Sequence, residues 1–332
     1  MTVLARAHRV AAEPMLPRAR GSATEELFAH LQQQCRALPR QPEPDDAEDA
    51  ALALYVLYEL HYRGFAAVDE RWEWEPSVLR CRRALEEGFE HDLRTTVRRI
   101  DVAPCRVVEE LQAIATKGGP SLSGWLEARG TREQMQEYAV HRSAYQLKEA
   151  DPYTWAVPRL YGAEKAALVE IQHGEYGDGR ADALHSALFA DTMRALELDP
   201  TYGAYIDRIP AVTLETVNLM SLFGLHRRLR GALVGHLTLF EMCSVGPMRR
   251  YAFTLRRLGV PAAAPFYDVH VDADDRHAAI ALYDMARGLA HDEPDLANDI
   301  IFGAHALDAV ESAFARHLLE SWQAGRSSLR PC

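Results

Sequence analysis

The sequence contains no uninterrupted apolar run of about 18 residues, the length that a membrane-spanning helix requires. Its first residues also lack the compact charged-then-apolar pattern of a secretory leader. Hydrophobic residues nevertheless make up 48% of the 332 residues, which is enough for a sizeable buried core. These features predict a globular cytoplasmic protein that has no membrane partner.

Cysteine is scarce and unpaired in its spacing. The five cysteines are an odd number, and no two of them form a CxxC pair. This pattern favours a reducing compartment and argues against both a disulfide framework and a zinc–thiolate site.

Nucleotide-binding and nucleic-acid-binding signals are also missing. Gly174, Gly177 and Gly179 stand in the reverse order of a dinucleotide fingerprint, and no GxxxxGK[ST] motif occurs. The formal net charge of -11 argues against a nucleic-acid partner, because phosphate contacts need a concentrated basic surface. Because the sequence has no flavin or nicotinamide motif, any redox chemistry would need a separate reductant or reductase.

Alternating patterns of β-branched and aromatic residues are almost absent, so we predict an all-α fold. Residues 1–21 have no clean period and are expected to form a disordered or extended arm. Auxiliary helices are expected over 22–130, and a helical core over 131–325, which can be continuous with them. The expected helices include 226–243, 247–258 and 265–289. In the first of these, Gly231 and Gly235 are four residues apart, which allows another helix to pack closely.

The segment from His270 to His277 carries the clearest chemical pattern. In a helix, His270, Asp274 and His277 occupy positions i, i+4 and i+7 and share one face. Two imidazoles and a carboxylate suit Fe, Mn or Zn. The alternative interpretation is an acidic helix start in which the two histidines occur by chance.

Glu241 lies in the otherwise apolar run from Leu237 to Cys243. An unpaired buried carboxylate would cost several kcal/mol, on the order of the penalty for burying a charge. A metal ion would satisfy it, and so would an ion pair with Arg249, Arg250 or a histidine.

Other candidate ligands lie upstream, and spacing alone does not choose among them. Glu175 and His185 are ten residues apart and can face one centre if the intervening glycines bend the backbone. Lysine and glutamate pairs at a helix end, such as Lys148 and Glu149, are more often solvated. The candidates are Glu149, Glu170, His173, Glu175 and His185.

Taken together, these motifs resemble the heme-oxygenase-like di-iron oxidase and oxygenase family, often labelled iron-containing redox enzymes. The resemblance extends over roughly residues 45–320. Its distinctive element is HxxxDxxH preceded by a glutamate and by a distant Glu-plus-His pair. The matching segments are His141-Arg142-Ser143, Tyr145 to Pro152, Glu170-Ile171-Gln172, Glu175-Tyr176-Gly177, Phe240-Glu241 and His270-x-x-x-Asp274-x-x-His277.

The resemblance implies a heme-oxygenase-like helical bundle that holds two ferrous ions. Two ferrous ions carry four positive charges, and three carboxylates leave one of these uncompensated, so we consider Glu149 as a seventh ligand. The local departure from the family pattern is His173-Gly174, which follows Glu170-Ile171-Gln172. The ligands that the resemblance implies are Glu175 and His185 from the first core helix, Glu241 from the second, and His270, Asp274 and His277 from the third.

The same resemblance implies an oxygen-dependent oxidase or oxygenase of specialised metabolism. Its substrate would be a small amine, an amino-acid-derived compound or a fatty-acid-like molecule, and its reaction N-oxygenation, desaturation or oxidative carbon–carbon cleavage. An external electron donor and a homodimer are also expected. The alternatives are a mononuclear zinc hydrolase using His270, Asp274 and His277, and a non-catalytic helical metal-binding protein. A heme protein would need an axial histidine but none of the carboxylates.

Overall fold

The computed structural model describes residues 13–97 and 101–331, except for the side chains of residues 272–275. Every regular element within these residues is a helix, which confirms the predicted all-α fold. The helices of the N-terminal part are α1 (Ser22–Leu31), α2 (Ala47–Glu59), α3 (Pro76–Thr96), α4 (Val107–Ala115) and α5 (Leu122–Arg129). Those of the remainder are α6 (Arg132–Gln146), α7 (Gly162–Glu175), α8 (His185–Ala195), α9 (Ala211–Leu225), α10 (Arg230–Arg257), α11 (Pro265–Ala279), α12 (Arg287–Asp292) and α13 (Ala297–Gln323).

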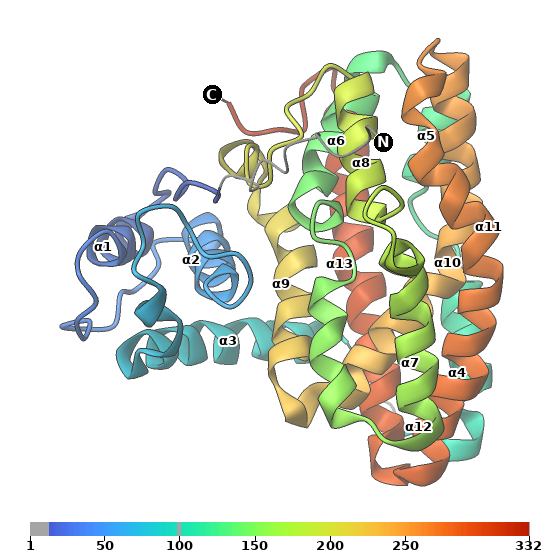
Figure 1. The fold of residues 1–332 in the computed structure, drawn as a ribbon, viewed down its shortest axis with the longest axis horizontal. Helices are drawn as coiled ribbons and strands as arrows, with labels where there is room; N and C mark the ends of the chain where they lie inside the picture. Colours follow the sequence, from blue (N-terminus) through green and yellow to red (C-terminus); the bar gives the residue numbers. More distant parts are fainter. Residues whose placement is uncertain (1–12, 98–100, 332) are drawn as a thin grey trace, which may run out of the picture.

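The longer helices stand side by side as an upright bundle, and α1, α2 and α3 lie against one flank of it (Figure 1). Helix α10 packs against α11 and α13, while α2 packs against α9. The close approach of α10 and α13 agrees with the glycine spacing, because a Cβ on Gly235 would collide with the backbone of Ile300. None of the helices in the described residues is both long and apolar enough to cross a membrane.

Two helices differ from the sequence-based boundaries. We expected separate helices over 226–243 and 247–258, but α10 continues through Pro247. A proline in a helix interior removes one backbone hydrogen bond, and here the packing of α10 against its neighbours maintains the helix. The expected helix over 265–289 is interrupted by a π-helical segment, Ile280–Ala286, between α11 and α12. Such segments often occur near functional sites.

The described part of the N-terminal arm, residues 13–20, has no regular secondary structure. Its Arg20 side chain donates hydrogen bonds to the backbone carbonyls of Ile206 and Ile209, at 2.7 and 2.8 Å, and pairs with Glu48. This part of the arm is therefore attached to both α2 and the segment that leads into α9.

The apolar interior consists of two clusters. One contains Leu168 and Ile171 of α7 and Leu239 of α10, and the other contains Phe189 of α8 and Met248 of α10. The end of α7 and the start of α8 lie in sequence between Ile171 of the first cluster and Phe189 of the second. The middle of α10 likewise lies between Leu239 of the first and Met248 of the second. The candidate ligands of those helices therefore lie where the two apolar clusters meet.

Candidate metal centre

Six of the seven candidate ligands come together as buried side chains. Each is at most 8% exposed, so their carboxylates and imidazoles are largely removed from solvent. They are Glu149 after α6, Glu175 at the end of α7, His185 at the start of α8, Glu241 in the middle of α10, and His270 and His277 on α11.

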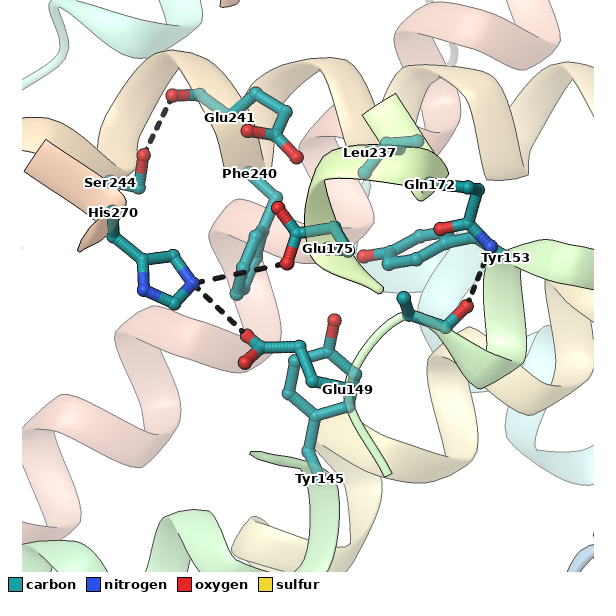
Figure 2. A pocket seen from close by; sticks show the side chains of 11 residues that line it. Tyr145, Glu149, Tyr153, Gln172, Glu175, Leu237, Phe240, Glu241, Ser244 and His270 are labelled. Carbon is teal, nitrogen blue, oxygen red and sulfur yellow. Dashed lines mark hydrogen bonds and ion pairs between the residues drawn. The ribbon is translucent and has the colours of Figure 1, made fainter. Parts of the chain in front are cut away.

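The first group contains Glu149, Glu175, His185 and His270, each offering one ligand atom within 4.8 Å of the others. His185 Nδ1 lies 2.7 Å from Glu175 Oε2 and 3.1 Å from His270 Nε2. His270 Nε2 also lies 3.6 Å from Glu149 Oε1 and 3.9 Å from Glu175 Oε2, and Figure 2 shows these three side chains converging. This group could hold one metal ion.

The second group contains Glu175, Glu241 and His277. His277 Nδ1 lies 3.4 Å from Glu175 Oε1 and 3.7 Å from Glu241 Oε2. Glu175 therefore belongs to both groups, with one carboxylate oxygen facing each. A carboxylate in this position could bridge two metal ions.

The two histidines of the HxxxDxxH segment fall into different groups. Seven residues of helix rise by about 10.5 Å, so His270 and His277 cannot easily bind one small ion together. This geometry disfavours the mononuclear alternative. Asp274 lies between them on α11, but its side chain is outside the described residues.

The donor set fits a pair of iron ions. Glu149 Oε2 is buried and has no hydrogen-bond partner among the described residues. Clustered buried carboxylates repel one another, and a divalent cation would remove that repulsion. Mixed imidazole and carboxylate ligands are those that iron prefers. The cavity between the groups has a volume of only about 10 Å³, which is room for a small ion or a water molecule rather than an organic substrate.

Hydrogen bonding orients the ligands before any metal binds. His270 Nδ1–H donates to the backbone carbonyl of Phe266 at 2.7 Å, which leaves the lone pair of Nε2 directed at the first group. Burial alone raises the pKa of Glu175, but hydrogen bonds from His185 and His277 outweigh it and hold the pKa well below its ordinary value. Glu175 is therefore ionised at neutral pH.

A tight turn after α7 brings Glu175 and His185 together. Gly177 has φ of +64°, and a Cβ there would collide with the backbone of Ala183. This turn bends the backbone as the sequence analysis required. The competing candidates point away from the centre, because exposed His173 pairs with Asp178 and exposed Glu170 pairs with Arg276.

The turn that carries Glu149 is held on both sides. Buried Lys148 donates to Glu59 Oε2 at 2.7 Å, and each of these side chains is 1% exposed. On the other side, Gln172 Nε2 donates to the carbonyl of Ala150 at 3.0 Å, and Ala150 adopts a left-handed φ of 73°. The alternative that Lys148 and Glu149 are solvated does not hold, since both are buried, and the buried partner on α2 was not visible from local sequence.

Sequence reasoning missed two tyrosines that line the small cavity, Tyr145 and Tyr153. The Tyr153 hydroxyl lies 2.9 Å from His236 Nδ1. His236 itself does not line the cavity and contacts its wall through Tyr153. Tyr145 precedes Glu149 by four residues, and this spacing is the sequence signal that could have identified it.

Because burial lowers the pKa of His236 to about 3 from an ordinary 6.5, this residue makes the metal-free protein sensitive to acid. Between these values the unfolded chain binds a proton that the folded chain does not, so stability falls as the pH falls. Each pH unit in that window costs about 1.4 kcal/mol. We expect the unfolding free energy in urea to fall by about 2 kcal/mol less from pH 7 to pH 5 in His236→Gln than in wild type. An equal loss in both proteins would show that His236 is not the cause.

Gly174 makes room for the His277 ring. A Cβ at Gly174 would lie 2.8 Å from His277 Nε2 and 2.9 Å from Cε1, closer than real side chains approach. Gly174→Ala should therefore displace the imidazole and weaken iron binding, even though alanine favours the helix by about 1 kcal/mol. The measurement is an anaerobic Fe(II) titration beside thermal unfolding of the metal-free protein. Unchanged iron affinity would contradict the placement of His277.

Comparison with known proteins agrees with this geometry. A sequence model of a family described as iron-containing redox enzyme matches residues 136–312, which is more than half of the chain. The matched region contains every candidate ligand from Glu149 to His277. None of the curated proteins matches this sequence.

Proposed function

Because the chain belongs to the iron-containing redox enzyme family, we propose that it is a non-heme di-iron enzyme that uses dioxygen to oxidise a small organic molecule. The observation that carries this proposal is Glu175, whose two oxygens face two ligand groups at once. A single-metal protein has no need of such a carboxylate. A pair of ferrous ions, when bound, supplies the electrons that activate dioxygen.

The ligand assignment follows from the two groups. Asp274, on α11 with His270 and His277, remains a proposed ligand, but we do not assign it to either ion. Glu149, Glu175, His185 and His270 would hold one ion, and Glu175, Glu241 and His277 would hold the other.

The residues around the centre exclude water from it and place polar groups on its wall. Apolar residues on both sides keep the centre dry, which strengthens every electrostatic contact within it. Tyr145 and Tyr153 place hydroxyl groups on the cavity wall, and the Tyr153 hydroxyl is held by His236. These hydroxyls give the wall a polar edge beside the carboxylates. The sequence shows no flavin or nicotinamide motif, so electrons for further turnovers would come from a separate reductant or reductase.

The substrate classes implied by the resemblance are small amines, amino-acid-derived compounds and fatty-acid-like molecules, and the reactions are N-oxygenation, desaturation or oxidative carbon–carbon cleavage. The test is stopped-flow mixing of anaerobic Fe(II)-loaded protein with oxygen. Wild type should show a transient visible absorbance that His277→Ala and Glu241→Ala lose. If the protein binds iron but consumes no oxygen in the presence of any tested compound from these classes, it is a metal-binding protein without this activity.

A further inference from the structure

A second cavity, about 350 Å³ in volume, lies next to the candidate metal centre. It is lined by α5, α6, α10, α13, the end of α4 and the connection between α4 and α5, and it opens to solvent on one side. Tyr145, Phe240 and Ser244 line both this cavity and the small one between the ligand groups. All three appear in Figure 2 beside the carboxylates. These three side chains therefore stand between the larger cavity and the metal ligands.

Two aromatic rings form most of the wall shared by the two cavities. The rings of Tyr145 and Phe240 stand edge to face with centroids 6.0 Å apart and planes at 84°. A molecule in the larger cavity that contacted these rings would lie one side chain away from Glu149 and Glu241. The cavity is also within the size range of sites for small organic molecules, about 300–1,000 Å³.

Another cavity, of about 460 Å³, borders the opposite side of the centre and includes His185 and His277 in its wall. Its described wall carries four charged side chains, Asp178, Arg180, Asp182 and Arg276. Charged side chains are a smaller share of the 350 Å³ cavity, five of its 25 lining residues against four of 11, and its apolar residues include Ile114, Leu122, Leu239, Met248 and Leu307. An organic molecule gains free energy mainly by burying apolar surface, so the 350 Å³ cavity suits it better than the 460 Å³ cavity.

The charged side chains of the 350 Å³ cavity already have partners. Arg142 donates to both carboxylate oxygens of Glu311, at 2.8 and 2.6 Å. Lys117 pairs with Asp308 at 2.8 Å, and Arg250 lies 3.6 Å from Glu127. An anionic group would have to displace one of these carboxylates. The interior therefore disfavours a buried charge on the ligand.

Gln146 is a buried polar side chain in this wall, and its amide oxygen lacks a partner in the described part of the chain. It is 2% exposed, and its Oε1 is buried without a hydrogen bond among the described residues. It immediately follows Tyr145 and lies one helical turn before Glu149. A primary amide both donates and accepts hydrogen bonds, so a neutral group with the same capacity would satisfy it.

We propose that the 350 Å³ cavity binds the organic substrate, and that this substrate is a mostly apolar molecule whose buried end carries an uncharged hydrogen-bonding group of the amide type. Gln146 recognises that end, and Tyr145 and Phe240 place the adjacent carbon or nitrogen atoms next to the metal ligands. Any charged group of the substrate stays at the rim, near Lys117 and Arg250. The assignment of the occupant as substrate rests on the proposed function, whereas the binding preference rests on the cavity alone.

The test is isothermal titration calorimetry of the full chain with octanamide and octanoate, which share an alkyl tail and differ in the charge of the end group. Octanamide should bind about tenfold more tightly than octanoate. Gln146→Leu keeps the size of the side chain and should weaken octanamide about tenfold, the effect of one or two buried hydrogen bonds, with little effect on octanoate. Tighter binding of octanoate, or no effect of Gln146→Leu, would overturn the assignment.

A cavity-filling variant locates the binding. Cys243 is exposed where it lines the open side of the cavity, and Cys243→Trp should block entry and abolish binding of both probes. Cys105→Trp is the matched control, because Cys105 is exposed like Cys243 but lies outside the cavity wall. Ser312→Phe at the opposite wall is the second variant if Cys243→Trp does not fold. Unchanged octanamide binding in a folded cavity-filling variant would place the site elsewhere.

The same titrations in metal-free and anaerobic Fe(II)-loaded protein separate the two proposals. If octanamide binds as described but iron does not bind as a pair, the cavity stands and the di-iron function fails. If iron binds as a pair but neither probe binds, the cavity assignment fails and the proposed function stands.

Discussion

Glu175→Gln is expected to remove iron from both positions of the centre. The substitution keeps the shape of the side chain and removes the charge that faces both ligand groups. An anaerobic Fe(II) titration should fall from about two irons per chain in wild type to less than about one. Glu241→Gln should lose about one iron only, because Glu241 belongs to a single group.

Glu170→Gln is the matched control for this experiment. Glu170 lies on the same helix, α7, but is exposed and pairs with Arg276, so its loss should leave iron binding unchanged. If Glu175→Gln retained one tightly bound iron, as Glu241→Gln is expected to, Glu175 would belong to one site rather than to two.

Glu59→Gln is expected to produce the largest loss of stability. Glu59 and Lys148 form an ion pair of 2.7 Å with each side chain 1% exposed, and Tyr202 also donates to Glu59 at 2.7 Å. Removing one charge leaves the other buried without a counterion, which costs about 3–5 kcal/mol. Urea unfolding of the metal-free protein measures this loss. Iron affinity should also fall, because Lys148 precedes Glu149.

Two further variants separate the ion pair from general damage. The double variant Glu59→Gln, Lys148→Met leaves no unpaired charge and should recover most of the stability. Glu87→Gln breaks the exposed pair of Arg83 and Glu87 and should cost less than about 1 kcal/mol. Equal losses for Glu59→Gln and the double variant would show that the ion pair is not the source of the effect.

The fold class could be predicted from sequence because helical periodicity is local information. Pro247 misled the boundary of α10, because a proline usually starts or ends a helix and only packing by distant segments keeps this one continuous. The π-helical segment at Ile280–Ala286 has no local sequence signal either. Both differences come from tertiary contacts that a single sequence does not reveal.

The candidate site was predictable in composition but not in arrangement. Spacing placed His270 and His277 on one helix face, the apolar run around Glu241 singled out that carboxylate, and family resemblance chose Glu175 and His185 among the upstream candidates. Spacing could not choose Glu175 over Glu170, because that choice depends on the turn at Gly177. The two-group arrangement around Glu175 likewise depends on four helices that meet only in the folded chain.

The most direct test of the central claim is Mössbauer spectroscopy of the wild-type chain loaded anaerobically with ⁵⁷Fe(II) and then exposed to oxygen. The account predicts about two irons per chain that become a magnetically coupled ferric pair on oxidation, because Glu175 would hold the two ions close together. About one iron per chain, or two that show no magnetic coupling after oxidation, would contradict a centre built around Glu175.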